Sequence, residues 1–424
     1  MAGGPIGVAH EYTAVVHFQG GTRVHTAIEG LIGVSWERKL DDYSEASIVV
    51  AKQGTSRACG GLLGQVTPWA HELSIYRDGA LVWQGPITQK TETRDALQFS
   101  ARDVIAWLDR RVIDLTFSNP DDAPDDPEHN TYVGETGIML QQIINKTFPE
   151  GDPYNNPGIT PYARVDRTPG IYAKSKQIWR GSQTVGDLVR DLIKVGVDMF
   201  TLGRKLYMVP DSYRLNRAPY RLTDDHFLGD VEMVENGLDT ATEGMVAATP
   251  EMTDVEGGQS TTNPAPYVAK YPQGHHGGAG DPSAPAWWSR ITKFSTTQQS
   301  ADPNDPGGQP DMRALMGLAQ AIRAYGFPTP RSIKIPNQAQ LSPEAPLSVG
   351  QLVPGRPVRV ELTRFYTPIA QAFRINEVAV SWGQTNVSSG ASGGGGGAGN
   401  AEQIQLSLDA MRQPPVSDEE EGAS

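Results

Sequence analysis

The sequence predicts a mainly β fold of the α+β class, and three observations support this prediction. Glycine (46 residues) and proline (32 residues) are abundant in a chain of 424 residues, as in turn-rich β proteins. Several short segments alternate apolar and polar residues at a period of two, which is typical of strands with one buried face. Helical periodicity is confined to a few short segments.

The segment Glu72 to Ile113 has the clearest strand pattern. Leu73 and Ile75 alternate with polar neighbours, and Asp78-Gly79 predicts a tight hairpin turn before the next strand. Gly85-Pro86 is expected to interrupt the hydrogen-bond ladder, because proline has no N–H to donate. The region therefore reads as a small barrel or sandwich.

A second hairpin and a short helix follow. The chain runs from Ile87 to Glu92, turns, and returns through Leu97 and Phe99, after which Asp103 is a good N-cap for a helix that plugs the barrel or sandwich. We expect the large apolar residues of this first β region to be buried together, namely Trp36, Trp83, Phe99, Trp107 and Leu108.

The order of the motifs from Val34 to Ile113 resembles that of a known family. The motifs are Trp36 to Asp42, Tyr76 to Gly79, Trp83 to Ile87 and Ala101 to Asp103. In this order they resemble the tail hub, or minor tail protein, of long-tailed (siphovirus) phages of actinobacteria, which is distantly related to the baseplate hub of contractile-tailed phages. The resemblance extends over Gln183 to Pro210 and, more weakly, to Met411.

The resemblance implies two β-barrel-like tail-hub domains with an inserted α/β domain. The expected bounds are 1–113 for the first β-barrel hub domain, 114–215 for the inserted α/β domain, and 216–256 with 327–412 for the second β-barrel hub domain. Residues 257–326 are expected to be an irregular insertion with one helix, and residues 413–424 an acidic C-terminal tail. A faint echo of the first strands in the second half agrees with a duplicated barrel.

Local patterns add helices and loops to this outline. Helices are expected over residues 134–146, after a Thr184 cap, and after an Asp311 cap. Loops are expected over residues 119–130 and 149–170, and residues 388–399 read as a flexible hairpin tip because they are nearly pure Gly, Ser and Ala. The strands expected in the second half include 241–249, 358–362, 373–380 and 404–408.

The chain is acidic, with a net charge of −13. Such a chain is a poor general nucleic-acid binder, because affinity for phosphates comes mostly from Lys and Arg. One interpretation is that the charge serves solubility. The other is that acidic walls keep a passing DNA from adhering, and in this case a lumen surface should be neutral to negative.

No motif predicts catalysis, a cofactor or a metal site. His275-His276 has no other ligand at a suitable spacing, and Asp41-Asp42 with Asp121, Asp122, Asp125 and Asp126 lacks the spacing of a calcium loop. His71-Glu72 lacks the second histidine of a zinc-protease helix, and Cys59 reads as a buried or half-buried thiol. The sequence therefore predicts that the protein is not an enzyme.

Three classes of function remain. The family resemblance favours a structural virion protein of the tail tip, a homotrimeric hub that forms a conduit for DNA ejection. Its implied partners are the distal tail protein ring, the tape measure protein and downstream tip or fibre proteins, with DNA as a transient passenger. The alternative is a receptor- or carbohydrate-binding tail protein, with Trp287, Trp288 and Trp382 as aromatic platforms. A cell-wall-degrading enzyme is the third class, but no block of sequence is left to house its site.

The candidate protein interface is an aromatic island in the long insertion, carried by Trp287, Trp288 and Phe294. It either contacts a neighbouring chain or packs back on its own barrel. No apolar run reaches the roughly 18 residues of a membrane helix, and no signal peptide is apparent, so we expect assembly in the host cytoplasm and no stable membrane insertion.

Overall fold

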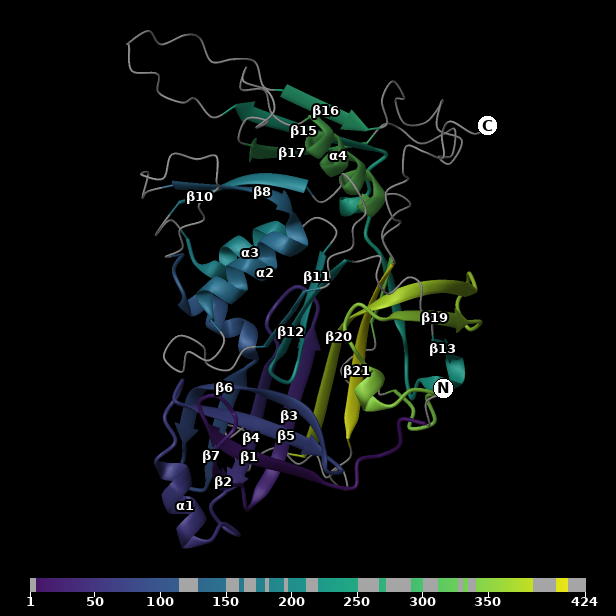
Figure 1. Cartoon of the computed structure of the whole chain (residues 1–424). Helices are drawn as coiled ribbons and strands as arrows, with labels where there is room; N and C mark the ends of the chain where they lie inside the picture. Colours follow the sequence, from purple (N-terminus) through teal and green to yellow (C-terminus); the bar gives the residue numbers. More distant parts are fainter. Residues whose placement is uncertain are drawn as a thin grey trace.

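The computed structural model describes residues 5–113, 129–149, 160–163, 173–179, 183–193, 197–210, 220–250, 267–271, 291–299, 312–326, 331–334, 341–383 and 402–410. Figure 1 shows a large sheet in the lower part of the molecule, with two helices beside it and a small helix-covered sheet at the top. The fold is mainly β, as predicted.

The helices are α1 (Arg57–Gly64), η1 (Val104–Arg110), α2 (Thr136–Thr147), α3 (Val185–Ile193), η3 (Asp224–His226), η4 (Gly237–Asp239), α4 (Met312–Gly326) and η5 (Val349–Gln351). The strands of the first half are β1 (Tyr12–Phe18), β2 (Val24–Ala27), β3 (Leu31–Lys39), β4 (Glu45–Ala51), β5 (His71–Arg77), β6 (Ala80–Glu92), β7 (Ala96–Arg102), β8 (His129–Glu135), β9 (Thr160–Ala163), β10 (Ala173–Trp179), β11 (Val197–Leu202) and β12 (Lys205–Pro210). Those of the second half are β13 (Tyr220–Thr223), β14 (Glu232–Glu235), β15 (Glu243–Pro250), β16 (Tyr267–Tyr271), β17 (Thr292–Gln299), β18 (Arg331–Lys334), β19 (Pro357–Leu362), β20 (Ile369–Gly383) and β21 (Gln403–Ala410).

One 13-stranded sheet contains strands from both ends of the chain. Its main order is β14-β18-β21-β20-β3-β4-β7-β6-β5-β1-β2, and β19 pairs with both β13 and β20. The two ends meet where β20 runs antiparallel to β3, with Val380 opposite Trp36. The sequence predicted two barrel-like domains; in the structure their strands form one continuous ladder, and the division into two domains stays a prediction.

Strand β6 changes its partner strand after Pro86, next to Gly85. Its first half pairs with β5 and its second half, from Ile87, pairs with β7. A Cβ atom on Gly85 would lie 2.0 Å from the carbonyl oxygen of Arg102 and 2.7 Å from the Cα of Asp103. Only glycine permits this approach of two backbones. The predicted interruption at Gly85-Pro86 is thus a change of partner within one long strand.

The main core packs against one face of the large sheet and contains residues from both ends of the chain. Its buried members include Trp36, Trp83, Phe99, Phe373 and Leu406. Two members of the predicted core lie elsewhere. Leu108 is buried in a second core, and Trp107 is only partly buried against that core. The prediction that these two residues fill the first β region was therefore wrong.

This second core is built on α2, α3 and the β11–β12 hairpin. The helix η1 contributes Val104 and Leu108 to the core that it shares with α2 and α3, so it does not plug the first β region as predicted. As predicted, Thr184 caps α3: its Oγ1 accepts a hydrogen bond of 3.1 Å from the Asp187 N–H. Two strands form where loops were expected, since β8 begins at His129 and β9 pairs in parallel with β12.

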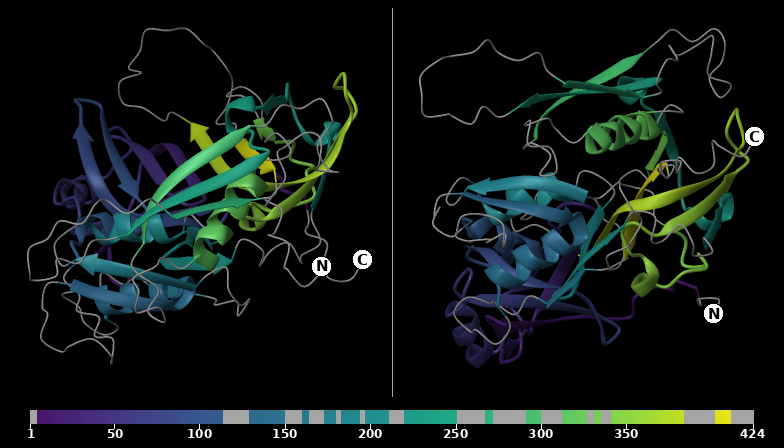
Figure 2. Two further views of the ribbon diagram at one scale, coloured as in Figure 1. Left: turned by 90° about the horizontal axis from the view of Figure 1, so that it is seen from above. Right: turned by 45° about the horizontal axis from the view of Figure 1, so that its top comes forward.

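A third unit is inserted in the sequence between β14 and β18, which pair with each other in the large sheet. The chain leaves the large sheet after Glu235 and returns at Arg331, and these two residues lie opposite each other in the ladder and form an ion pair of 2.7 Å. Between them, β15, β16 and β17 form a separate sheet covered on one face by α4 (Figure 2). The sequence predicted irregular chain for most of this insertion and assigned 241–249 to the second β domain. Strands β16 and β17 form there, and β15 joins them.

Candidate functional site

The large sheet has one apolar face and one polar face. Along β3, β4, β7, β20 and β21 the buried residues alternate with half-buried or exposed ones. The side chains on the core face include Trp36, Ile48, Phe99, Val380 and Leu406. The opposite face carries small or uncharged polar residues at most of the corresponding positions, including Ser35, Ser47, Ser100, Ser381 and Gln405.

The strand register aligns these polar residues into a row across the sheet. Ser100 lies opposite Ser47, and Ser47 lies opposite Ser35. The row continues from Ser35 to Ser381 and from Ser381 to Gln403. Because residues opposite each other in a ladder point to the same face, hydroxyl and amide groups form one band over five strands. We call this band the polar face.

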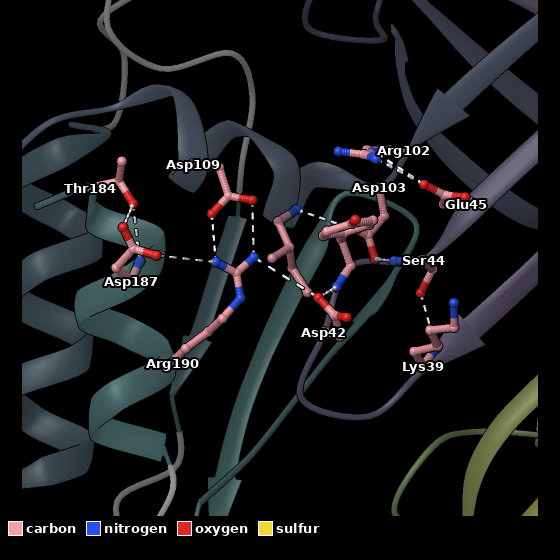
Figure 3. A network of polar contacts seen from close by, with 12 residues as sticks. Lys39, Asp42, Ser44, Glu45, Arg102, Asp103, Asp109, Thr184, Asp187 and Arg190 are labelled. Atoms are coloured by element: carbon pink, nitrogen blue, oxygen red, sulfur yellow. Dashed lines mark hydrogen bonds and ion pairs between the residues drawn. The ribbon is translucent and has the colours of Figure 1, made fainter.

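A shallow hollow of about 410 Å³ lies on the polar face. The charged residues that line it are Glu37, Glu45 and Arg102, which gives a net charge of 1 − 2 = −1. Arg102 forms an ion pair of 3.0 Å with Glu45 (Figure 3). Lys39 forms one of 2.6 Å with Glu37. The cations on this face are therefore held by carboxylates of the same face.

Partial burial also affects Glu37 itself. It raises the pKa of the Glu37 carboxyl, and the neighbouring ammonium of Lys39 offsets part of this effect. Burial disfavours the ionised form of this carboxyl, and Lys39 already neutralises its charge. Glu37 is therefore a weak site for a passing cation.

Asp103 connects the end of the polar face to the second core. Its carboxylate accepts hydrogen bonds from Ser44 N (3.0 Å), Thr201 Oγ1 (2.7 Å) and Ile105 N (3.1 Å). Complete burial raises the pKa of Asp103 to about 6, and the hydrogen bonds from Thr201, Ser44 and Ile105 act against that rise. One side chain thus joins the β3–β4 turn, η1 and β11.

Arg190 forms the second link between these parts. Its guanidinium donates two hydrogen bonds to the Asp109 carboxylate, of 2.7 and 2.9 Å, and lies 3.9 Å from Asp42 and 4.0 Å from Asp187 (Figure 3). Asp109 packs so closely on α3 that a Cβ on Gly186 would lie 1.9 Å from its Oδ1. The arginine thus lies between three aspartates and offsets their charge.

Two buried ion pairs attach the β11–β12 hairpin to the large sheet. Arg204, in the turn of the hairpin, pairs with Glu72 on β5. Asp198 on β11 pairs at 3.0 Å with Arg374 on β20. The hairpin therefore contacts strands from both ends of the chain, and it holds the second core at a set position beside the sheet.

The predicted interface residues are only partly within the described residues. Phe294 lies on β17, opposite Met245 of β15, and 55% of its surface is exposed. Trp287 and Trp288 lie outside the described residues, as do His275-His276 and the acidic C-terminal tail. The structure thus places Phe294 on an outward-facing strand of the small sheet and leaves the rest of the island as a prediction.

The other singled-out residues have structural roles. Trp382 is half-buried, with its ring 5.6 Å from that of Tyr12, so it does not offer a free platform for a sugar. Cys59 is buried in α1, as expected. Asp41 Oδ1 accepts a hydrogen bond of 2.8 Å from Met199 N, and Asp42 Oδ1 accepts one from Tyr43 N.

The described part of the chain holds no group of three or more His, Cys, Asp or Glu side chains placed to bind a metal ion. None of its helices has the length and hydropathy that crossing a bilayer requires.

The polar face was not predicted from the sequence, although the polar positions of the individual strands could be recognised. The serines occupy the polar phase of segments that alternate correctly, such as Ser47 between Ala46 and Ile48. Alternation alone does not reveal which strands lie side by side. The band appears only once β20 pairs with β3, a contact between opposite ends of the chain.

Comparison with known proteins gives a fold but no sequence family. No family model matches the chain, and no curated protein sequence matches it. Solved structures do match: a tail protein from Neisseria meningitidis has a TM-score of 0.55 at 12% identity, over 94% of this chain and 97% of that one. The 43 kDa tail protein of prophage MuSo2 from Shewanella oneidensis has a TM-score of 0.54 at 11% identity, over 95% and 99%. Prophage tail protein gp18 from Listeria monocytogenes has a TM-score of 0.51 at 8% identity, over 95% of each chain. Over nearly its whole length, this chain shares the fold of these phage tail proteins.

Proposed function

We propose that this protein is a structural component of a phage-type tail, a hub at the tail tip whose polar face lines a passage. The observation that carries the proposal is the polar face itself. It is a band of serines and glutamines across five strands, in a fold that prophage tail proteins share. The motif order that resembles actinobacterial tail hubs supports the same role.

The chemistry of the polar face suits passage better than binding. Its cations are paired with neighbouring carboxylates, so a passing DNA meets no free cluster of Lys or Arg to hold its phosphates. Hydroxyl and amide groups also present no apolar patch on which a passing polypeptide could adhere. A surface with a net charge of −1 in its hollow agrees with the neutral-to-negative lumen expected from the sequence.

We infer a homotrimer from the arrangement of the sheet. One ladder contains the strands of both β-rich regions, so three copies around an axis would present six such regions in alternation. A threefold hub of this kind could dock on a sixfold tail tube. In this proposal its neighbours are the distal tail ring, the tape measure protein and the tip fibre, with DNA as a transient passenger.

The small sheet and α4 are proposed to contact a neighbouring chain of the tail through Trp287, Trp288 and Phe294. Two observations support this role. Phe294 and Ile291 are exposed on or beside β17, and the unit has its own core, separate from that of the large sheet. It is joined to the large sheet at Glu235 and Arg331, where the chain leaves and returns.

Thiol labelling tests the passage directly, because the one native cysteine, Cys59, is buried. Ser47→Cys places a thiol on the polar face, and Val24→Cys places one on an exposed strand at the far end of the sheet. In the free chain both should react with a small maleimide and with a large polymer-linked one. In assembled particles Ser47→Cys should keep its reaction with the small reagent and lose that with the large one, while Val24→Cys is the reference. Equal labelling of Ser47→Cys by both reagents in particles would contradict a lumen.

A further inference from the structure

The turn of the β11–β12 hairpin meets the large sheet at a buried cluster of polar side chains. Glu72 on β5 is fully buried and pairs with Arg204, whose side chain is only 16% exposed. His17 on β1 lies directly opposite Glu72 in the ladder, so the two side chains point to the same face of the sheet. We call His17, Glu72 and Arg204 the junction.

The β1–β2 turn covers the junction. The N–H of Gly20 donates a hydrogen bond of 3.0 Å to the Glu72 carboxylate. Gly21 has a φ angle of +64°, and a Cβ atom on it would lie 2.5 Å from Nη1 of Arg204 and 2.5 Å from Nε2 of Gln84. Glycine is therefore required for the turn to lie this close to the ion pair, and the close turn limits the access of water.

His17 is buried without the partners that a polar ring normally has. It is only 7% exposed, and neither of its ring nitrogens has a hydrogen-bond partner in the described part of the chain. Burial lowers the pKa of the imidazole below its ordinary 6.5, and the nearby Arg204 cation lowers it further. The ring is therefore uncharged at neutral pH, and the junction then contains one anion and one cation.

Of the described residues, two charged side chains face His17: Glu72 from β5 and Arg204 from the hairpin turn. The next residue, Phe18, points to the opposite face of the sheet. The titratable side chains that surround Phe18 on that face are Arg23, His25 and His71. A proton bound by His17 thus places a second cation beside Arg204, next to a carboxylate that balances only one.

We propose that the junction is a proton-operated latch: protonation of His17 separates Arg204 from Glu72 and lets the turn of the β11–β12 hairpin lift from the large sheet. The base of the hairpin stays attached, because Asp198 on β11 pairs at 3.0 Å with Arg374 on β20 and neither residue type ordinarily titrates between pH 5 and 7. The hairpin belongs to the second core, so the latch controls how firmly that core is held beside the sheet. This device is a property of the single chain and does not depend on the tail role.

Asp103 titrates in the same pH range but acts in the opposite direction. Its carboxylate accepts a hydrogen bond from Thr201 on β11, and burial raises its pKa to about 6. A carboxyl whose pKa is raised by folding favours the folded state as the pH falls, so Asp103 opposes release of the hairpin. Its effect is the same in a His17 variant and in the unmodified protein, and their difference isolates the contribution of His17.

Limited trypsin digestion of the full chain at pH 7.5 and pH 5.5 tests the latch, because trypsin cleaves after Arg204 only when this side chain leaves Glu72. Cleavage after Arg364, whose side chain is 73% exposed, is the internal reference and cancels the pH dependence of the protease. Mass spectrometry of the products gives the ratio of the two initial rates. A single histidine that regains its ordinary pKa on release raises the open fraction by at most about 10-fold between these pH values, so the ratio should rise by about 3- to 10-fold.

His17→Leu and His17→Gln cannot take up this proton, so their ratio should be the same at both pH values. The two variants differ in shape and polarity, so a packing defect in one is recognised by comparison with the other. His10→Gln, which removes an exposed histidine, should keep the full rise. An unchanged ratio in the unmodified protein, or the same rise in both His17 variants, would overturn the latch. Neither result bears on the tail role, which thiol labelling of particles tests separately.

Discussion

Replacing Gly85 by alanine tests the crossing on which the large sheet depends. The added Cβ would lie 2.0 Å from the carbonyl oxygen of Arg102, whereas ordinary contacts begin near 3.4 Å. The two backbones must therefore separate by about 3.4 − 2.0 = 1.4 Å, or the strand must bend. Overpacking of a well-packed site costs about 1–3 kcal/mol. Because the obstacle here is backbone that also positions Asp103, we expect a loss at the upper end, about 3 kcal/mol.

Urea unfolding followed by tryptophan fluorescence measures this loss, since Trp36 and Trp83 lie in the affected core. The matched control is Gly61→Ala on α1, where an added Cβ meets no atom within 4 Å. There alanine should leave stability unchanged or raise it by up to about 1 kcal/mol, through its better helix propensity. If Gly85→Ala unfolds within about 0.5 kcal/mol of the unmodified protein, the proposed crossing of the two backbones is wrong.

Three further predictions concern the core, pH and the insertion. Trp36→Ala should destabilise by about 3–5 kcal/mol and the half-buried Trp107→Ala by clearly less, as measured by urea unfolding; equal losses would contradict the two cores. Burial, with a contribution from the nearby Arg204, lowers the pKa of His17 below its ordinary 6.5, so its contribution to stability is present above pH 6.5 and is lost as the pH falls through its folded pKa. His17→Leu should therefore reduce the loss of stability between pH 7 and pH 5, and an unchanged pH profile would count against this. Joining Glu235 to Arg331 through Asn-Gly should excise the insertion, leave the melting temperature of the rest within a few degrees and abolish incorporation into tails; normal incorporation would remove the insertion from the interface.

Local chemistry accounts for the parts of the fold that the sequence predicted well. Asp78 and Gly79 both have positive φ angles, as the tight turn between β5 and β6 requires. Thr184 caps α3 because its hydroxyl lies three residues before the Asp187 N–H. In these cases the residues that decide the structure are neighbours in the chain, so their spacing alone is informative.

Contacts between distant segments account for what the sequence did not predict. A register shift between Ile75 and Tyr76 interrupts the pairing of β5 with β6, so Leu81 is exposed although it stands only two residues before the buried Trp83. Leu108 could have faced either of two cores, and only the position of α2 and α3 decides between them. Likewise, the alternation in 241–249 predicted a strand correctly but not the sheet that it joins.

The polar face shows the same limit for the candidate site. Its serines occupy the polar positions of segments whose alternation predicts strands. Such positions usually belong to a face of the sheet that solvent covers. The distinction between solvated surface and a lined passage depends on copies of the chain around an axis, which no local pattern encodes. The aromatic island was conspicuous for the opposite reason, since aromatic residues stand out in a Gly- and Pro-rich segment of the sequence.

The central claim is that three copies of this chain surround a passage lined by the polar face. Cryo-electron microscopy of intact particles, at a resolution that traces the large sheet, tests it most directly. The expected result is a threefold ring at the tail tip, with Ser35, Ser47 and Ser100 facing the axis and Trp36 facing away from it. A single copy at a fibre tip, a ring of six, or a polar face covered by another protein would contradict it.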